Sequence, residues 1–482
     1  MEYKWTVFGV TSIGVLMAAI DGQIIIVGLP QVARALHADV EQAIWFTQSY
    51  VFVSTVTLLF IGKITDTIGR VKIYTFGFVI FTIGSALTSL SMNPEQLILF
   101  RGVQGLGSAM LTVNSAALLI DAAGGRNIGF FMGLNAFNVR GGSILGLTLS
   151  GVILSFLDWR YLFYINIPIG ILGTYLAYKL LKETHTYGKR PPMDWIGFGT
   201  FTTAIACLLL GLTFSAYGQA SFSVTVLLSF LAAASFAIFL VRETRFSNPM
   251  VDLKLFRIRA FAGSSIAILF NSISWGAVLL LLSLYLQLVR GFSPLQAGSI
   301  LIPFQVAVLS VGPLSGRLSD RYGRVPFTVV GLLLQGSAVF LFSTLSSSTG
   351  TYSIIAYMLV FGFGTGMFNS PISSSIMESA PPDRRGIASA TYNAFFAVGF
   401  TLSLNLSIII MTSIIPYQVI SSLLATGTSS GSSQINGILF GEAISRAYLF
   451  LAALDFVAVI PAFLRGETKI PSASRTVPAR IQ

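Results

Sequence analysis

The sequence predicts an all-helical integral membrane protein, built from two related bundles of six helices with two further helices inserted between them. Hydrophobic residues make up 54% of the 482 residues and charged residues only 10%, and the mean hydropathy is +0.80. Apolar runs of about 18 residues or more recur along the whole chain, which excludes a closed barrel of short alternating strands. A short polar motif also appears twice in matching contexts, which favours two related halves.

The apolar runs define about fourteen membrane spans. We expect them at residues 6–28, 42–62, 73–91, 96–120, 128–156, 161–180, 195–214, 222–241, 260–289, 296–316, 327–346, 352–376, 388–415 and 447–465. The predicted units are an N-terminal six-helix bundle at 1–190, an inserted helix pair with its cytoplasmic loops at 191–258, and a C-terminal six-helix bundle at 259–482. Residues 416–446, rich in Ser, Gly and Thr, are expected to form an outer loop.

The repeated motif lies between two apolar runs in each half of the chain. Its first copy contains Gly62, Asp66, Gly69 and Arg70, and its second contains Gly316, Asp320, Gly323 and Arg324. Each copy predicts a tight turn between helices, in which the second glycine allows positive φ or close backbone approach. The acid can pair with a nearby arginine or accept from backbone amides. A chance hydrophilic loop would explain one copy more easily than two.

The basic residues predict the orientation of the chain. Placing both termini in the cytoplasm assigns most of the 29 Lys and Arg residues to cytoplasmic loops and leaves outside only Arg34, Arg160, Arg290 and Arg446. The net charge of +11 then reflects the membrane, and the sequence has no long basic cluster of the nucleic-acid-binding type. A single cysteine, Cys207, excludes an internal disulfide, and the sequence contains no Cys/His cluster that would predict a metal.

Several ionisable side chains lie within spans, where a charge is costly and therefore suggests function. Asp21 lies in the first span, and Arg101 lies in the fourth, one turn before Gln104. A carboxylate whose proton affinity depends on whether a cation is near meets the requirement of proton coupling. The alternatives are that Asp21 snorkels to the outer end of its helix or that the pair is structural.

Two more charges lie deep in the spans. Arg140, near the middle of the fifth span, could bind an anionic substrate group or could neutralise Asp21 permanently. Asp455 is the deep acid of the last span and is a candidate proton site, with a structural hydrogen-bonding role as the alternative.

Polar and aromatic side chains inside the spans are the candidates for a substrate cavity. They are Gln48, Gln104, Asn114, Asn138, Arg140, Asn271, Trp275, Gln305, Asn369 and Asn393. Some of these are equally expected to form hydrogen bonds between helices. Trp275 would suit an apolar, cationic or aromatic substrate.

Four stretches, in order, resemble motifs of the major facilitator superfamily, most of all its fourteen-span drug:proton antiporter branch. Residues 62–70 are similar to the loop motif between the second and third helices, and 316–324 are similar to its degenerate repeat. Residues 19–30 resemble the first-helix motif of that branch, 101–107 the fourth-helix motif linked to proton coupling, and 159–170 the segment opening the sixth helix.

The fifth span departs from the family pattern. Leu147 stands where the antiporter motif has a proline, so the helix loses the kink that the proline would give. Small residues remain at spacings of about four and predict close packing against another helix, namely Gly142, Gly146, Ser150 and Gly151.

The resemblance implies a secondary transporter that works by alternating access and exports drug-like amphipathic compounds in exchange for protons (multidrug efflux by proton antiport). Asp21 would carry the proton with Arg101 as its partner. An acid at the cytoplasmic end of the fourth helix would join the loop motif in a charge network that holds the outward-facing state shut. That latch would consist of Asp66, Arg70 and Asp121, with a second copy at Asp320, Arg324 and Glu378.

The expected partners are a small-molecule substrate, protons and the lipid bilayer, with no nucleic acid. We expect a monomeric, multi-pass protein of the plasma membrane that needs no cofactor beyond the proton gradient as its energy source. The sequence contains no nucleotide-binding loop, metal cluster or nucleophile–base pair that would indicate an enzyme. Two alternatives stay open, a uniporter or importer of an anionic metabolite and a membrane sensor that does not transport.

Overall fold

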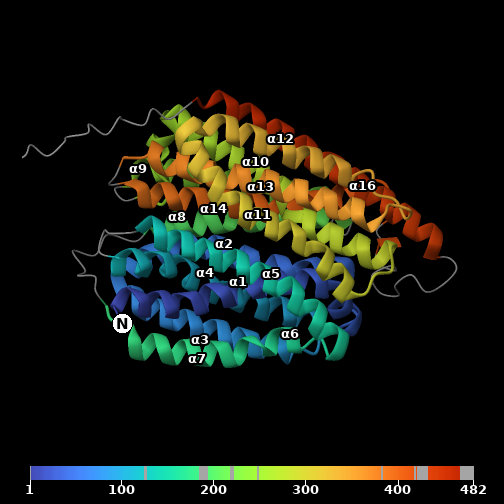
Figure 1. The fold of residues 1–482 in the computed structure, drawn as a ribbon, viewed down its shortest axis with the longest axis horizontal. Helices are drawn as coiled ribbons and strands as arrows, with labels where there is room; N and C mark the ends of the chain where they lie inside the picture. Colours follow the sequence, from blue (N-terminus) through green and yellow to red (C-terminus); the bar gives the residue numbers. More distant parts are fainter. Residues whose placement is uncertain are drawn as a thin grey trace, which may run out of the picture.

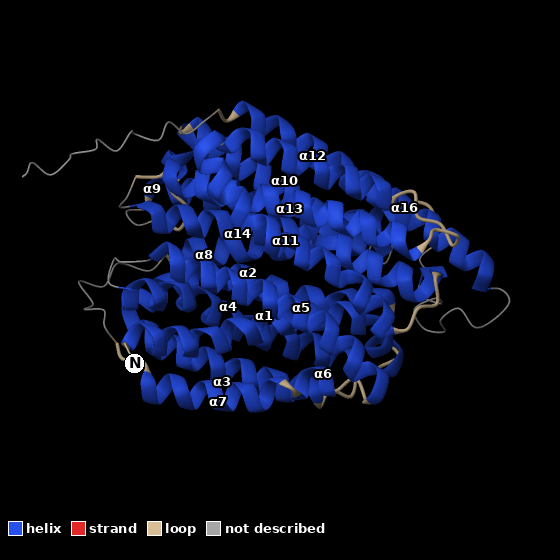
Figure 2. Cartoon of the chain, viewed as in Figure 1, coloured by secondary structure: helices blue, strands red, loops and turns tan. Residues whose placement is uncertain are grey.

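The computed structural model describes residues 2–123, 128–183, 194–217, 222–246, 249–381, 384–416, 419–420 and 433–466. Within these ranges all regular secondary structure is helical (Figure 2). Thirteen of the described helices are long and apolar enough to cross a membrane, and α2 (Val40–Ile68) is a further long helix beside them. The predicted all-helical membrane fold is therefore confirmed.

The helices form two bundles that lie one above the other in Figure 1. The first contains α2 and α1 (Tyr3–Ala35), α3 (Arg70–Ser89), α4 (Pro94–Ala123), α5 (Ile128–Phe156), α6 (Tyr161–Tyr164) and α7 (Asn166–Leu180). The second contains η1 (Leu253–Arg257), α10 (Arg259–Leu284), η2 (Tyr285–Val289), α11 (Pro294–Tyr322), α12 (Arg324–Phe342), α13 (Thr351–Ser379), α14 (Arg385–Thr412) and α16 (Ser433–Leu464).

The same local chemistry begins and ends matching helices in the two bundles. Asp39 caps α2 and Ser293 caps α11, each through a capping box with the glutamine three residues later. Gly69 ends α2 with φ +124°, and Gly323 ends α11 with φ +95°. Only glycine adopts this backbone without strain, so each repeated motif forms a one-residue junction at which the next helix starts.

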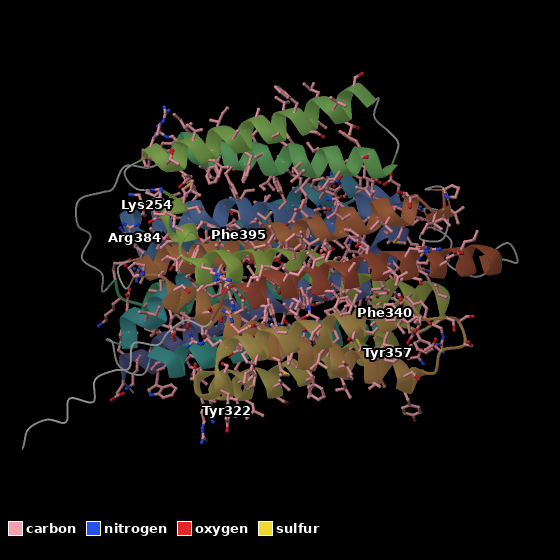
Figure 3. The ribbon with its side chains drawn as sticks, turned by 90° about the horizontal axis from the view of Figure 1, so that it is seen from above. Lys254, Tyr322, Phe340, Tyr357, Arg384 and Phe395 are labelled. Carbon is pink, nitrogen blue, oxygen red and sulfur yellow. The ribbon has the colours of Figure 1, made fainter. Side chains whose placement is uncertain are left out.

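The inserted pair, α8 (Trp195–Tyr217) and α9 (Phe222–Arg245), lies along one side of the molecule and is drawn in green in Figure 3. Phe198 of α8 stacks on Phe60 of α2 with ring centroids 4.2 Å apart, and Thr213 of α8 donates to Asn405 of α14 at 3.1 Å. Helix α8 therefore contacts both bundles. Helix α9 leaves apolar side chains such as Phe230 exposed, as expected for a face in contact with lipid.

The two bundles meet at the end of the molecule away from the N-terminus. An apolar seam there includes Leu29, Ile44, Leu280, Leu284 and Leu404, and it leaves a cavity of only about 20 Å³. A space of that size holds about one water molecule, so the seam closes this end to any larger solute.

Helix α16 begins 14 residues earlier than the last predicted span, at Ser433 instead of residue 447. The predicted outer loop 416–446 is therefore wrong for its final part, and residues 421–432 lie outside the described chain. The early part of this helix resembles a loop in the sequence because its Ser and Gly residues interrupt a helical pattern of apolar residues. Phe440, Ala443, Ile444 and Ala447 recur at helical spacing and are buried in a core cluster that extends over both bundles.

Candidate functional site

A fully buried ion pair lies in the middle of the first bundle. Asp21 of α1 and Arg101 of α4 have no solvent exposure, and Arg101 Nη1 lies 2.5 Å from Asp21 Oδ2. Because α1 extends from Tyr3 to Ala35, Asp21 lies near its midpoint and not toward its outer end as the predicted span implied. A snorkelling position for Asp21 is thereby excluded.

Amide side chains complete the hydrogen bonding of the carboxylate. Asn166, the first residue of α7, donates to Asp21 Oδ1 at 2.9 Å, and Gln104 donates to the same oxygen at 3.1 Å. Gln104 also accepts from Arg101 at 2.9 Å and donates to Ser85 of α3 at 2.7 Å. The charge of Asp21 is thus compensated by one cation and two neutral donors in a dry environment.

Arg101 has binding partners besides Asp21. Its Nε donates to the Phe46 carbonyl at 3.0 Å, and its guanidinium carbon lies 4.4 Å from the centre of the Tyr50 ring. Its Nη2 has no hydrogen-bond partner among the described residues. The carbonyl and the ring face would keep the cation in place if its contact with Asp21 weakened.

A second buried network surrounds Asp455 of α16 in the other bundle. Asn271 donates to Asp455 Oδ1 at 3.0 Å and Gln335 donates to the same oxygen at 3.4 Å, while the Ser274 hydroxyl donates to Oδ2 at 2.8 Å. Thr365 in turn donates to Gln335 at 3.2 Å. Within the described chain no ion pair forms at Asp455, so neutral donors alone compensate this carboxyl.

The two networks occupy corresponding helices of the two bundles. The first connects α1, α3, α4 and α7, and the second connects α10, α12, α13 and α16. In the N-terminal bundle the acid lies on the first helix and an amide lies on the last helix. In the C-terminal bundle the acid lies on the last helix and an amide lies on the first helix. An arginine is present only in the first network, as far as the described residues show.

The residues of the repeated motif form ion pairs at the end that carries the N-terminus. Arg70 Nη1 lies 2.6 Å from Asp121, and the Arg324 fork binds both oxygens of Glu378 at 2.6 and 2.7 Å. Asp320 accepts a further bond from Arg324 at 3.1 Å. These pairs join α3 to α4 and α12 to α13, so each holds one bundle together internally. The side chain of Asp66 lies outside the described residues.

The two remaining glycines of the motif differ in their surroundings. A Cβ at Gly316 would lie 2.5 Å from the Ser370 hydroxyl of α13, whereas a Cβ at Gly62 would meet Val113 only at 3.9 Å. Close helix approach therefore requires glycine in the second copy and not in the first. Glu183, which the sequence analysis did not single out, accepts from the amides of Arg70 and Val71 at 3.1 Å and so caps α3.

The small residues of α5 pack against two different helices. A Cβ at Gly142 would lie 2.7 Å from that of Ala19, and one at Gly146 would lie 2.6 Å from the Ile20 carbonyl oxygen, so both contact α1. Ser150 is buried on this side near Gly28. Gly151 instead contacts Leu295 of α11 in the other bundle at 2.7 Å.

The contact between α5 and α11 ends near the middle of the molecule. Leu147 carries no proline kink, and its carbonyl oxygen lies 2.7 Å from a Cβ at Gly298. Arg140 lies seven residues before Leu147 on α5, and Gln305 lies seven residues after Gly298 on α11. Because the two helices are antiparallel, both residues lie further toward the end that carries the N-terminus, each on the same face of its helix as the contact residue. Another seven residues along α11, a Cβ at Gly312 would meet nothing within 4 Å. Helices α5 and α11 therefore separate toward the end that carries the N-terminus, which leaves an opening between them.

Arg140 faces this opening from α5. It is half-buried, and no hydrogen bond or ion pair forms at its guanidinium within the described chain. Tyr392 of α14 lies close enough that a charge on its phenol oxygen would be felt by the guanidinium. Since Asp21 is bound by Arg101, Arg140 does not neutralise it. One of the two roles that the sequence left open for Arg140 is thus excluded.

The other predicted cavity residues divide into four groups. Gln48 donates to the Thr401 carbonyl across the bundle seam at 3.3 Å, and Asn138 donates to Ser12 at 2.6 Å, so both connect helices. Asn114 and the exposed Asn393 donate to carbonyls of their own helices, and Asn369 is half-buried on α13. Gln104 and Asn271 belong to the acid networks. Trp275 is half-buried on α10, and Gln305 is buried on α11, the helix that faces Arg140.

Aromatic side chains gather around Trp275 of α10. Its ring centroid lies 5.7 Å from Phe400, 6.0 Å from Phe396 and 6.3 Å from Phe304. Phe396 and Phe400 are stacked and half-buried on α14, one and two turns beyond Tyr392. Of these rings, only Trp275 could be chosen as a cavity candidate from the sequence. Phenylalanine is so frequent in membrane helices that its presence alone does not indicate a cavity.

Comparison with known proteins decides the family. The model of the Major Facilitator Superfamily matches residues 11–195 and 194–404. The chain belongs to this superfamily. This chain is therefore a multi-span membrane transporter. The protein lies in the lipid bilayer and binds a small-molecule substrate.

Relatives with assigned roles include drug exporters. The chain is 31% identical over 421 residues to the riboflavin transporter RibZ of Clostridioides difficile, covering 84% of this chain and 90% of that one. It is 31% identical over 399 residues to the multidrug resistance protein Stp of Mycobacterium tuberculosis, covering 81% and 73%. It also resembles the tetracenomycin C resistance and export protein of Streptomyces glaucescens, at 27% identity over 416 residues, 85% and 76% of the two chains.

Solved structures share the fold at low identity. A bacterial homologue of the human lysosomal transporter Spinster, in an inward-facing and unoccupied conformation, superposes with a TM-score of 0.69 and 14% identity, covering 96% of this chain and 97% of that one. The human organic anion transporter MFSD10 gives a TM-score of 0.61 at 15% identity and covers 96% of this chain. These likenesses establish the fold alone.

Proposed function

We propose that this transporter exports small amphipathic compounds in exchange for protons, by alternating access between its two bundles. The observation that carries the proposal is the dry ion pair of Asp21 and Arg101, which has no bulk solvent to stabilise either charge. The tetracenomycin C resistance and export protein and the multidrug resistance protein Stp support drug export, and the riboflavin transporter shows that a related chain also handles a planar metabolite.

A proton on Asp21 would remove the Coulomb attraction that holds α1 to α4. Arg101 would then rely on the Phe46 carbonyl, on Gln104 and on the ring of Tyr50. The amide groups around the carboxyl can remain, because a carboxylic acid still accepts at one oxygen. Protonation therefore weakens one helix contact without disrupting the bundle.

Helix α1 can transmit this change to the seam. Six residues after Asp21, the carbonyl of Val27 accepts from Gln287 of the second bundle at 3.0 Å. A ligand or proton shifts a two-state equilibrium by its difference in affinity for the two states. A proton that alters the position of α1 would thus bias opening and closing at the seam.

The charge distribution supports a plasma-membrane protein with both termini in the cytoplasm. In that orientation the described conformation is open toward the cytoplasm and closed outside by the apolar seam. The proton gradient would supply the energy, the transporter would work as a monomer, and no cofactor or catalytic step takes part.

The test is proton movement in proteoliposomes that contain a pH-sensitive dye, challenged with ethidium and with 1-naphthoate. We expect a transported compound to drive protons across the wild-type membrane, and Asp21→Asn to abolish this while still binding the compound. Asp158→Asn, at an exposed acid paired with Arg160, is the matched control and should behave as wild type. Proton movement that persists in Asp21→Asn would contradict the proposal.

A second candidate function is uniport or import of an anionic metabolite. The guanidinium of Arg140, which has no hydrogen-bond or ion-pair partner among the described residues, favours it. In this case an organic anion would move down its own gradient without any change in the dye signal, and Arg140→Gln would stop the flux while Asp21→Asn would not.

A further inference from the structure

We propose that the substrate is a planar aromatic anion, whose acidic group binds Arg140 and whose ring packs against Trp275, Phe396 and Phe400. The proposal rests on the proposed transport function and names the chemical class that the cavity accepts. It concerns binding in the opening between the bundles and does not depend on how transport is driven.

The position of Arg140 gives the anion site. Positions 140, 147 and 151 lie on one face of α5, since they are separated by seven and four residues. The last two contact α11 of the other bundle, so Arg140 points toward the same bundle at a depth where the two helices have separated. A guanidinium there presents several donors to the opening, and none of the described residues supplies an acceptor for them.

The nearby acids are not available to a cationic ligand. Asp21 is fully buried and bound by Arg101, and Asp455 is fully buried within the second bundle among neutral donors. Within the described chain, the middle of the opening therefore has a positive charge without an accessible negative one. A ligand that carries a carboxylate, sulfonate or phosphate would be attracted, and a cation would be repelled.

The aromatic side chains lie at a suitable distance from the anion site. Tyr392, whose phenol oxygen lies within range of the Arg140 charge, is followed on α14 by Phe396 and Phe400 at intervals of one helical turn. Four residues of helix rise about 6 Å, so the stacked rings begin about 6 Å beyond Tyr392. An acidic group attached directly to a fused ring system spans this separation.

Two unsatisfied polar atoms border the aromatic cluster. Trp275 Nε1 is a buried donor and Gln305 Oε1 is a buried acceptor, and neither has a partner in the described chain. Buried polar groups are ordinarily satisfied, and a ligand with polar atoms on its ring edge would satisfy these two. Gln305 also lies level with Arg140 on the facing helix, which places both groups within reach of one molecule.

The experiment compares three ligands that share one ring and differ in charge. These are 1-naphthoate, neutral 1-naphthamide and cationic 1-naphthylmethylammonium, with cyclohexanecarboxylate as the non-aromatic anion. Binding to the purified full-length protein is measured by equilibrium dialysis, which requires neither a membrane nor a proton gradient. We expect 1-naphthoate to bind at least tenfold more tightly than each of the others.

Variants assign the contacts. Arg140→Gln should weaken 1-naphthoate binding by about tenfold to a hundredfold and leave 1-naphthamide unchanged, as expected for loss of one charge-assisted interaction. Arg140→Lys should fall between, because it keeps the charge and loses the fork. Arg160→Gln, at a partly exposed arginine remote from the opening, is the matched control. Phe396→Leu should weaken all three naphthalene ligands by similar factors.

Equal binding of the acid and the amide by the wild type would overturn the proposal, even if no variant folds. Tighter binding of the cation would also overturn it, as would 1-naphthoate binding that is unaffected by Arg140→Gln. The proposed proton exchange fails by a different result, proton movement in Asp21→Asn, so the two failures can be told apart.

Discussion

The buried pair of Asp21 and Arg101 makes a quantitative prediction about stability. Asp21→Asn leaves the Arg101 guanidinium buried beside a neutral amide, and Arg101→Gln leaves the carboxylate with amide donors only. Each single change is expected to lower the free energy of unfolding by about 3–5 kcal/mol, since a buried charge loses its partner. The double variant removes both charges and should lose less than the sum of the two single losses.

The size of the expected coupling follows from the contacts. The 2.5 Å ion pair disappears in either single variant, while the bonds from Asn166 and Gln104 to position 21 can be kept in both. Asn166 Oδ1 has no partner among the described residues, so it is available to accept from an asparagine amide at position 21. We therefore expect a coupling free energy of at least about 2 kcal/mol between the two sites.

The assay is reversible unfolding in mixed SDS and detergent micelles, followed by tryptophan fluorescence for the wild type, both single variants and the double variant. A coupling within about 0.5 kcal/mol of zero would show that the two sites act independently. That result would refute the reasoning, because it would mean that the pair is not the dominant interaction of either side chain. Asp158→Asn serves again as the control and should have no measurable effect.

Three further changes have defined outcomes in the same unfolding assay. Asp455→Leu removes the acceptor of three buried hydrogen bonds and should lower the free energy of unfolding by about 2 kcal/mol, which is about 0.6 kcal/mol for each bond plus a small cost of poor packing. Asp455→Asn should lower it by less than about 1 kcal/mol. Equal losses in the two variants would contradict this expectation. Gly107→Ala should lower the free energy of unfolding by about 1–3 kcal/mol, because the new Cβ would lie 2.6 Å from the Phe81 backbone nitrogen. Gly102→Ala should leave it unchanged or raise it, because the nearest atom to its Cβ would lie at 3.4 Å and alanine favours the helix. Arg324→Lys should cost about 1 kcal/mol through loss of the two-pronged bond to its carboxylate partner, and no loss would show that solvent screens the pair.

Most of the fold could be predicted from sequence because lipid imposes one solution on a long apolar run. Each such run must form a helix, and the repeated glycine motif indicates two related halves. Helix ends were harder to predict. Phe440 and Ala443 lie in a stretch whose serines and glycines resemble a loop, and their helical spacing becomes informative only when the buried surface beneath them is known.

The site was predictable where a charge stands alone in a span. Asp21 and Arg101 are conspicuous for that reason, and the structure places them in contact. Asn166 stands out in the sequence only as part of a motif. The sequence does not show which residue an amide at the start of a helix will bind. The aromatic cluster at Phe396 and Phe400 was missed, since it depends on which face of α14 packs against Trp275 of α10.

A proton and the substrate are proposed to be linked through Asp21. The most direct measurement is the change in bound protons, as release or uptake, when saturating 1-naphthoate or ethidium is added to the purified protein in weakly buffered detergent solution. At least one of these compounds is expected to change the number of bound protons by up to about one per transporter in the wild type and by none in Asp21→Asn, which still binds it. An equal change in both proteins, or binding by the wild type without any change, would contradict this linkage.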